Sequence, residues 1–485
     1  MNKKITSEEQ FYKMTETPVG KLILTLAVPT IISALISVIY NTVDTFFVAK
    51  INKSAAAGVG VVFTIMSVIQ AFGYGIGMGA GSLISVVLGE KKKSEADKYA
   101  SSAVIEAFFF GTVVGTVGLI FSEPILKVLG CSETMLPYAE GYALFIFIAA
   151  PINCAAFVLN NALRAEGNTT LAMIGIGIGG VINVILDPIF IFTLDMGTMG
   201  ASLATGVGQA VSFIVLLVPY LIKKSVVNVS FKNISKNIKT YGKIFSTGIP
   251  TVFRQGLGAV SSALLNIQAV TYGDAAVAAI TISNKIYMFV RNLVLGIGHG
   301  YQPVAGYNYG AGRNDRVKKG FYFTCFLGTA ACIVCAALLG FFAEGVMKLF
   351  STERDVIGIG KTALIAGCAV MPFLSFSTYA NQTLQSLGFK FSATLLASCR
   401  QGIFFIPVIL IMPKLVGILG IQLAQPISDF LTFAVSLPYM IVFFKKRMQD
   451  NADKIVKAAG KPELNVVSNA AFTEESTDDS NAEAK

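Results

Sequence analysis

Long apolar segments follow one another along almost the whole chain, and this constrains the fold more than any other feature. Twelve of them are each about 20–30 residues long, and about 20 apolar residues suffice for a helix to cross a bilayer. They run near 22–48, 58–88, 99–121, 137–161, 169–194, 199–222, 244–270, 275–303, 320–343, 358–386, 391–413 and 417–444. We therefore expect an all-α integral membrane protein with twelve transmembrane helices.

The composition agrees with a membrane protein and excludes several other classes. Of the 485 residues 54% are hydrophobic and 14% are charged, and the mean hydropathy is +0.67. The net charge of +10 does not indicate a nucleic-acid partner, because the basic residues lie between apolar segments and form no continuous patch. A single histidine excludes a multi-histidine metal centre, and seven cysteines without a CxxC motif are typical of core residues. We expect no cofactor.

The two halves of the chain repeat each other at an offset of 221 residues. This offset takes Pro29 to Pro250 and Gly89 to Gly310, and AVPT at 27–30 is echoed by GIPT at 248–251. Six segments per half is an even number, so both halves enter the membrane from the same side. The repeat predicts two six-helix lobes, related by a parallel internal repeat, around a midplane cavity.

The basic residues predict the orientation and the domain limits. They concentrate on the side of the N-terminus, which the positive-inside rule places in the cytoplasm together with the C-terminus. The first twenty residues are polar and contain no signal-peptide core. The expected divisions are a cytoplasmic N-terminal segment (1–21), an N-lobe (22–222), a cytoplasmic linker (223–243), a C-lobe (244–444) and a disordered cytoplasmic tail (445–485), which we expect to be dispensable beyond about residue 455.

One carboxylate lies inside an apolar segment, in the stretch VINVILDPIFIF at 181–192. Asp187 is preceded by Asn183 one helical turn earlier, on the same face of the expected helix. Pro188 has no N–H, so the carbonyl of Val184 loses its helical partner and becomes available as a ligand. An ionised Asp at mid-membrane costs about 2.5–3.5 kcal/mol, which indicates a functional site.

A second intramembrane carboxylate, Asp44, lies in SVIYNTVDTFFVA at 37–49, with Tyr40 one turn before it. Pro29, about four turns earlier, is expected to bend this helix. Two acidic groups in one lobe predict a site for a proton or a small cation, since close carboxylates disfavour double ionisation. At the repeat offset Asp44 becomes Leu265 and Asp187 becomes Val408, so this pair belongs to the first lobe.

Other candidates are weaker. Intramembrane Glu106 has no evident partner, and His299 either titrates near neutral pH or packs between helices. The basic residues of the second lobe either line the cavity or pair with carbonyls; they are Arg254, Lys285, Arg291 and Arg400. The glycine-rich runs at 73–81 and 175–180 follow no soluble strand, so close helix packing explains them better than dinucleotide binding.

Several motifs together resemble those of the MATE (multidrug and toxic compound extrusion) transporters, closest to the bacterial DinF-like and MepA-like branch. The motifs are AVPT, SVIYNTVDTFFVA, NALRAEGNTT at 161–170, INVILDPIFIF at 182–192 and QPVAGYNYGAG at 302–312. The resemblance implies a multi-pass protein of the bacterial cell membrane. It further implies secondary active export of organic, often cationic, compounds in exchange for H⁺ or Na⁺.

The resemblance also implies a site. It assigns cation binding in the first lobe to Asp44, Asn183, Asp187, Thr205 and Asn160, with Tyr40 nearby. A Na⁺ ion would be held by the first four of these residues, and the first helix would bend at Pro29. Another MATE branch carries acidic residues in the seventh and tenth spans, and this sequence has none there, so that second-lobe ion site is not carried over.

Two alternatives remain open at this stage. A flippase for a lipid-linked precursor would use the basic residues of the second lobe to hold a pyrophosphate. An intramembrane aspartyl protease would use Asp44 and Asp187 as a catalytic pair. The expected partners are small molecules and the lipid bilayer, with no nucleic acid and no obligate protein partner.

Overall fold

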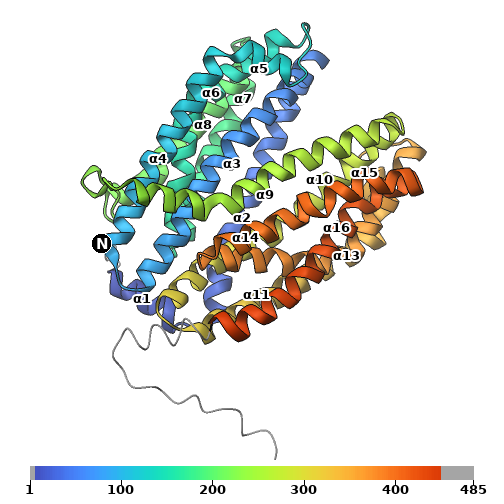
Figure 1. Cartoon of the computed structure of the whole chain (residues 1–485). Coiled ribbons are helices and arrows are strands. Elements are labelled where there is room, and N and C mark those ends of the chain that lie inside the picture. The colour runs from blue at the N-terminus through green and yellow to red at the C-terminus, as the bar shows by residue number, and fades with distance from the viewer. Residues whose placement is uncertain (1–5, 449–485) are drawn as a thin grey trace, which may run out of the picture.

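The protein, in a computed structural model that describes residues 6–448, is built from helices, and no strand occurs within this range (Figure 1). Ten helical segments of the described range are long and apolar enough to span a membrane. Two further helices, α9 (Ile238–Val270) and α10 (Asp274–Gly310), have 33 and 37 residues and cover the seventh and eighth predicted spans. With these two, the number of spans is the predicted twelve. The predicted C-terminal tail lies largely outside the described residues.

The first half of the chain forms the N-lobe. Its elements are α1 (Ser7–Glu16), α2 (Val19–Ala49), α3 (Lys53–Gly89), α4 (Lys93–Ile120), α5 (Ser122–Val128), α6 (Leu136–Ala165), α7 (Thr169–Pro188), the π-helix η1 (Ile189–Thr193) and α8 (Gly197–Leu221). The α7 helix changes to the π-helical η1 directly after Pro188, because proline cannot continue the regular hydrogen-bond pattern.

The second half repeats this plan after a linker that contains the short 3₁₀ helix η2 (Phe231–Asn233). After α9 and α10 come α11 (Asn314–Phe341), α12 (Ala343–Lys348), α13 (Arg354–Ser386), α14 (Lys390–Ser398), η3 (Cys399–Ile403), α15 (Phe405–Val416), α16 (Ile418–Val442) and η4 (Phe443–Arg447). The predicted repeat is visible in matching hydrogen bonds. The side-chain amide of Asn160 donates to the carbonyl of Ala172 (3.0 Å), and that of Asn381 donates to the carbonyl of Ala393 (2.5 Å), each 221 positions later.

The lobes are arranged as the two arms of a V (Figure 1). They meet where α3 packs on α9 and where α2 packs on α10, and both contacts depend on glycine. A Cβ atom on Gly248 would lie 2.1 Å from the carbonyl oxygen of Gly75, and one on Gly300 would lie 2.5 Å from the backbone of Ala27. Small residues allow such close approach of membrane helices. This confirms the packing role predicted for the glycines at 73–81.

The α1 helix bridges the two lobes at the end where they meet. The sequence predicted only a polar segment here, but Thr6 and Glu9 form a capping box that starts a helix. On the N-lobe side, Gln10 donates to the carbonyl of Glu166 (2.6 Å). On the C-lobe side, Arg313 donates to the carbonyl of Thr15 (2.8 Å). The helix therefore ties together the loops of both lobes.

The linker is held against the N-lobe by one buried carboxylate. Glu166 follows α6 and is fully buried. One of its oxygens accepts hydrogen bonds from the Ser225 hydroxyl (2.8 Å) and from the backbone N–H groups of Val226 (2.8 Å) and Val227 (2.9 Å). The other accepts from Asn168 (3.1 Å). Burial raises the pKa of Glu166 to about 7, although these hydrogen bonds act in the opposite direction.

We expect Glu166→Gln to remove a pH dependence of stability. The folded protein keeps a proton on Glu166 up to about pH 7, whereas the unfolded chain releases it near its ordinary pKa of 4.5. The free energy of unfolding should therefore fall as the pH rises from about 4.5 to about 7, by at most about 3 kcal/mol. Thermal unfolding of the wild type and the Gln variant between pH 4.5 and 8 measures this. Exposed Glu95→Gln is the control, and an unchanged pH profile in Glu166→Gln would contradict the expectation.

Candidate functional site

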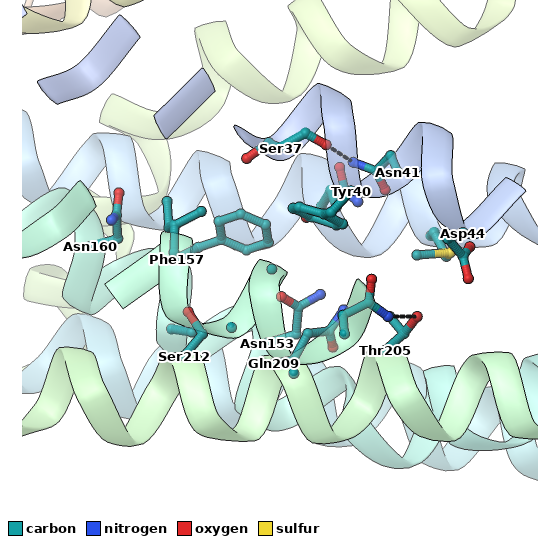
Figure 2. A pocket seen from close by; sticks show the side chains of 18 of the residues that line it. Ser37, Tyr40, Asn41, Asp44, Asn153, Phe157, Asn160, Thr205, Gln209 and Ser212 are labelled. Atoms are coloured by element: carbon teal, nitrogen blue, oxygen red, sulfur yellow. Dashed lines mark hydrogen bonds between the residues drawn. The ribbon is translucent and has the colours of Figure 1, made fainter. Parts of the chain in front are cut away.

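A cavity of about 800 Å³, counting the space open to solvent, lies inside the N-lobe. Its walls come from α2, α3, α6, α7 and α8, each of which contributes a polar side chain; these include Tyr40, Gln70, Asn153, Asn183 and Gln209 (Figure 2). The sequence predicted a cavity between the two lobes. The structure places this one within a single lobe and adds a smaller cavity of about 290 Å³ at the lobe interface.

The predicted cation-binding residues converge on this N-lobe cavity. Asn183 donates hydrogen bonds to Asp187 Oδ1 (3.2 Å), one turn along α7, and to the Thr205 hydroxyl of α8 (3.3 Å). Tyr40, Asp44 and Thr205 line the cavity with Asn183, while Asp187 is fully buried behind it. The same-face placement of Asn183 and Asp187 is as predicted.

Asn160 also lines the cavity, but it lies apart from the other predicted ligands. Figure 2 shows it at the opposite end of the cavity from Asp44 and Thr205. Its amide nitrogen donates a hydrogen bond to the carbonyl of Ala172, and its amide oxygen is buried without a hydrogen-bond partner among the described residues. The structure therefore brings Asp44, Asn183, Asp187 and Thr205 together and leaves Asn160 outside their group.

Asp44 is only 4% exposed, although it lies near the end of α2. Its Oδ2 accepts a hydrogen bond from the Tyr142 hydroxyl of α6 (2.9 Å). The charges of Asp44 and Asp187 are close enough to interact. Tyr142 also faces Thr205 and Asp187, so it stands among the proposed ligands. Tyr142 was not predicted as a site residue, because nothing in the sequence distinguishes it from the other fifteen of the 16 tyrosines.

Three buried oxygen atoms of this group have no hydrogen-bond partner among the described residues. They are Asp44 Oδ1, Asp187 Oδ2 and Asn183 Oδ1. Buried polar atoms normally find partners, so unpaired acceptors at one place indicate a ligand or a proton. Carboxylate, amide and hydroxyl oxygens suit a hard cation such as Na⁺, and two nearby carboxylates can also share a proton.

Pro29 lies inside α2, which runs from Val19 to Ala49 as one helix. The neighbouring Thr30 donates to the carbonyl of Gly296 in the C-lobe (2.6 Å), so this proline lies at the contact between the lobes. A bend of α2 at Pro29 would therefore change the contact between the lobes and move Asp44, which lies on the same helix. Bending at Pro29 remains a prediction.

The structure also places the weaker candidates. His299 is buried at the lobe interface, where its Nδ1 lies 3.0 Å from Gln302 Oε1. Glu106 is partly buried, and its Oε2 is enclosed without a partner among the described residues. Lys285 is exposed. Arg400 corrects one expectation: it pairs with a carboxylate and not with a carbonyl, since its Nε donates to Asp429 Oδ1 (2.6 Å).

Asp429 was overlooked in the sequence. It lies in α16, within the apolar segment at 417–444, and is fully buried. The rarity of ionised groups inside the membrane, which singled out Asp187, would have found it as well. The C-lobe therefore has its own buried carboxylate, at a position that is not equivalent to Asp44 or Asp187.

Comparison with known proteins now decides the family. The MatE family model matches residues 29–189 and again residues 250–411, one match in each lobe. The chain belongs to the MATE family. The starts of the two matched segments are separated by the 221 residues of the internal repeat. The predicted resemblance to MATE transporters is thus confirmed.

Among MATE relatives, the chain is 27% identical to the multidrug export protein MepA of Staphylococcus aureus (strain MSSA476), over 93% of this chain and 99% of that protein. It is 26% identical to MepA of Staphylococcus haemolyticus (strain JCSC1435), over 88% of this chain and 95% of that protein. A solved structure described as the outward-facing conformation of a multidrug resistance MATE transporter has a TM-score of 0.85 at 22% identity, and the alignment covers 93% of this chain and 99% of that one. This likeness confirms the two-lobe MATE fold.

Proposed function

We propose that this MATE protein is a secondary active multidrug exporter that moves organic, often cationic, compounds by antiport with H⁺ or Na⁺. The MepA relatives, which align along nearly their whole length, support multidrug export. The observation that carries the coupling is the pair of buried carboxylates, Asp44 and Asp187, each of which has one oxygen without a hydrogen-bond partner among the described residues, beside a large polar cavity. A charge buried in this way needs a counter-charge or a proton.

The proposed ion site comprises Asp44, Asn183, Asp187 and Thr205, with the Val184 carbonyl as an additional ligand. Tyr40 lines the same cavity, and Asn160 would act at its far end. We favour the proton over Na⁺, because two interacting carboxylates share a proton readily. Binding of the ion must weaken binding of the drug, and binding of the drug must weaken binding of the ion by the same factor. The corresponding coupling free energy is typically about 1–3 kcal/mol.

The alternatives have less support. The relatives described above are named multidrug export proteins, and none of these names supports a lipid flippase. Family membership indicates a transporter and not an enzyme, so the aspartyl protease reading has no support either.

We expect dye efflux from proteoliposomes to be driven by a pH gradient without sodium. A monovalent cationic dye that leaves against one entering proton moves no net charge, so its efflux should follow the pH gradient and ignore the membrane voltage. Efflux is measured by dye fluorescence with each gradient imposed separately. If efflux required sodium at every pH gradient, the proton would not be the coupling ion. If efflux responded to neither ion gradient, the proposed ion site would be wrong.

The positive-inside rule places both termini and the 223–243 linker in the cytoplasm, and the lobes would then open toward the outside. A reporter enzyme fused after residue 235 should therefore be active if it works in the cytoplasm and inactive if it works only outside the membrane. The test uses a pair of fusions, to an enzyme active in the cytoplasm and to one active outside the membrane. Activity of the second fusion would reverse the proposed orientation.

A further inference from the structure

Through the 221-residue repeat, the positions that line the N-lobe cavity have equivalents in the C-lobe, and three of these equivalents carry charged side chains. The equivalent positions are Met66 and Tyr287, Gln70 and Arg291, Gly179 and Arg400, and Gly208 and Asp429. In the N-lobe the two glycines are in backbone contact, since a Cβ on Gly179 would lie 2.5 Å from the carbonyl oxygen of Gly208. Their lack of side chains contributes to the open space of that cavity. The C-lobe has an arginine and an aspartate at the same positions.

Both carboxylate oxygens of Asp429 accept hydrogen bonds from neighbouring side chains in this cluster. Its Oδ1 accepts hydrogen bonds from Arg400 Nε (2.6 Å) and from Gln425 (2.9 Å). Its Oδ2 accepts from the Tyr287 hydroxyl and from the terminal nitrogen of Arg400 (3.4 Å). Since both oxygens already have two donors, Asp429 neutralises Arg400 and has little capacity left for another cation.

Two more guanidinium groups lie near this ion pair and form no salt bridge among the described residues. Arg291 on α10 and Arg254 on α9 are both within electrostatic reach of Arg400 and of each other. Arg254 donates one long hydrogen bond, to Asn381 Oδ1 (3.5 Å). The Nε of Arg291 is buried and has no partner among the described residues. The cluster therefore contains three guanidinium groups and one carboxylate.

This arrangement leaves an excess positive charge inside the membrane-spanning part of the C-lobe. Unpaired charges are costly there, and arginine residues in such positions pair with anions or with carbonyls. The planar guanidinium group matches a carboxylate through two parallel N–H donors, and two such groups can hold one anion between them. The excess charge thus matches an anion rather than a second cation.

We propose that Arg254 and Arg291 form a binding site for a monovalent anion in the C-lobe. The anion is either the carboxylate of a transported compound or an inorganic ion such as chloride, and only the first source rests on the proposed export function. The protein would then be bipolar, with an acidic N-lobe cavity for cations and a basic C-lobe site for anions. Compounds with both charges could be recognised by the two lobes together.

The test measures thermal stability of the purified full-length protein in detergent. Sodium benzoate or sodium chloride is titrated against a bulky buffer sulfonate at constant sodium concentration and ionic strength. A ligand that binds only the folded state raises the unfolding temperature. We expect the wild type to be stabilised and the Arg254→Gln/Arg291→Gln double variant to show no stabilisation. Lys285→Gln, on exposed α10 surface, is the matched control and should respond as the wild type does.

Removal of two partly buried charges that form no salt bridge should not prevent folding, and the unfolding transition of the double variant in sulfonate alone shows whether it is folded. Should it fail to fold, the single Arg291→Gln variant replaces it, with at least a tenfold lower anion affinity expected. An unfolding temperature of the wild type that neither anion raises would overturn the proposal. So would stabilisation of the folded Gln variant to the same extent as the wild type.

A dye pair distinguishes the two sources of the anion. Rhodamine 110 carries a free carboxylate, and rhodamine 123 is its methyl ester. If the bound anion is the carboxylate of a transported compound, the arginine substitutions should weaken binding of rhodamine 110 at least tenfold more than binding of rhodamine 123. A resident inorganic anion predicts equal effects on the two dyes together with stabilisation by chloride. Both measurements are made at equilibrium without any ion gradient, so their outcome is independent of whether the proposed antiport is correct.

Discussion

Asp44→Asn and Asp187→Asn are each expected to reduce uphill drug extrusion at least tenfold while leaving the protein folded in the membrane. Asparagine has the shape of aspartate, and its oxygen at position 187 can still accept the hydrogen bond from Asn183. It cannot take up a proton or offer a negative charge to a cation. Loss of a buried charge lowers the cost of insertion, so the amount of protein in the membrane should not fall. Efflux of a fluorescent dye from energised cells, normalised to the amount of protein, measures the effect.

The control for this prediction is Asp195→Asn. Asp195 is an exposed carboxylate between η1 and α8 with a φ of 49°, a backbone conformation that asparagine tolerates well. Its substitution should change efflux by less than about twofold, as is usual for surface positions. Drug binding by purified Asp44→Asn should persist, because coupling is lost and the cavity remains. Uphill transport retained by both Asp44→Asn and Asp187→Asn would end the coupling hypothesis.

The fold was largely predictable from the sequence, because the bilayer imposes simple requirements. Each span must be apolar over a fixed length, and the offset that relates Pro29 to Pro250 also relates the hydrogen bonds of Asn160 and Asn381. The placement of Asn183 and Asp187 on one face followed from helical periodicity alone. These features are local or periodic, so they can be recognised without knowing how the helices pack.

What the sequence did not reveal depends on packing between distant segments. Tyr142 reaches Asp44 across 98 residues, and Arg313 reaches Thr15 across 298. Neither contact has a spacing that marks it. Asn160 lies apart from the other proposed cation ligands for the same reason, because its distance from Asp44 depends on how α6 and α2 are placed within the lobe. Asp429 is different: its signal was present in an apolar segment and was overlooked.

The glycine contact between the lobes leads to the second large expected effect. Gly248→Ala should reduce transport at least tenfold, because the new Cβ atom would lie 2.1 Å from the carbonyl oxygen of Gly75 and 2.6 Å from its carbonyl carbon. Both are backbone atoms within the long α3 helix, so they cannot rotate away as a side chain can. The lobes would have to separate at the end where they now meet. A transporter that cannot close one end cannot alternate between its two open states.

Gly256→Ala provides a control in the same helix. Nothing lies within 4 Å of a Cβ atom at position 256, and both substitutions replace glycine by alanine inside α9, where alanine has the higher helix propensity by about 1 kcal/mol. Gly256→Ala should therefore transport within about twofold of the wild type and unfold at the same or a higher temperature. The two variants differ only in whether the added methyl group meets the opposite lobe. Equal dye efflux by Gly248→Ala and Gly256→Ala would show that the close contact of α3 and α9 is not required during transport.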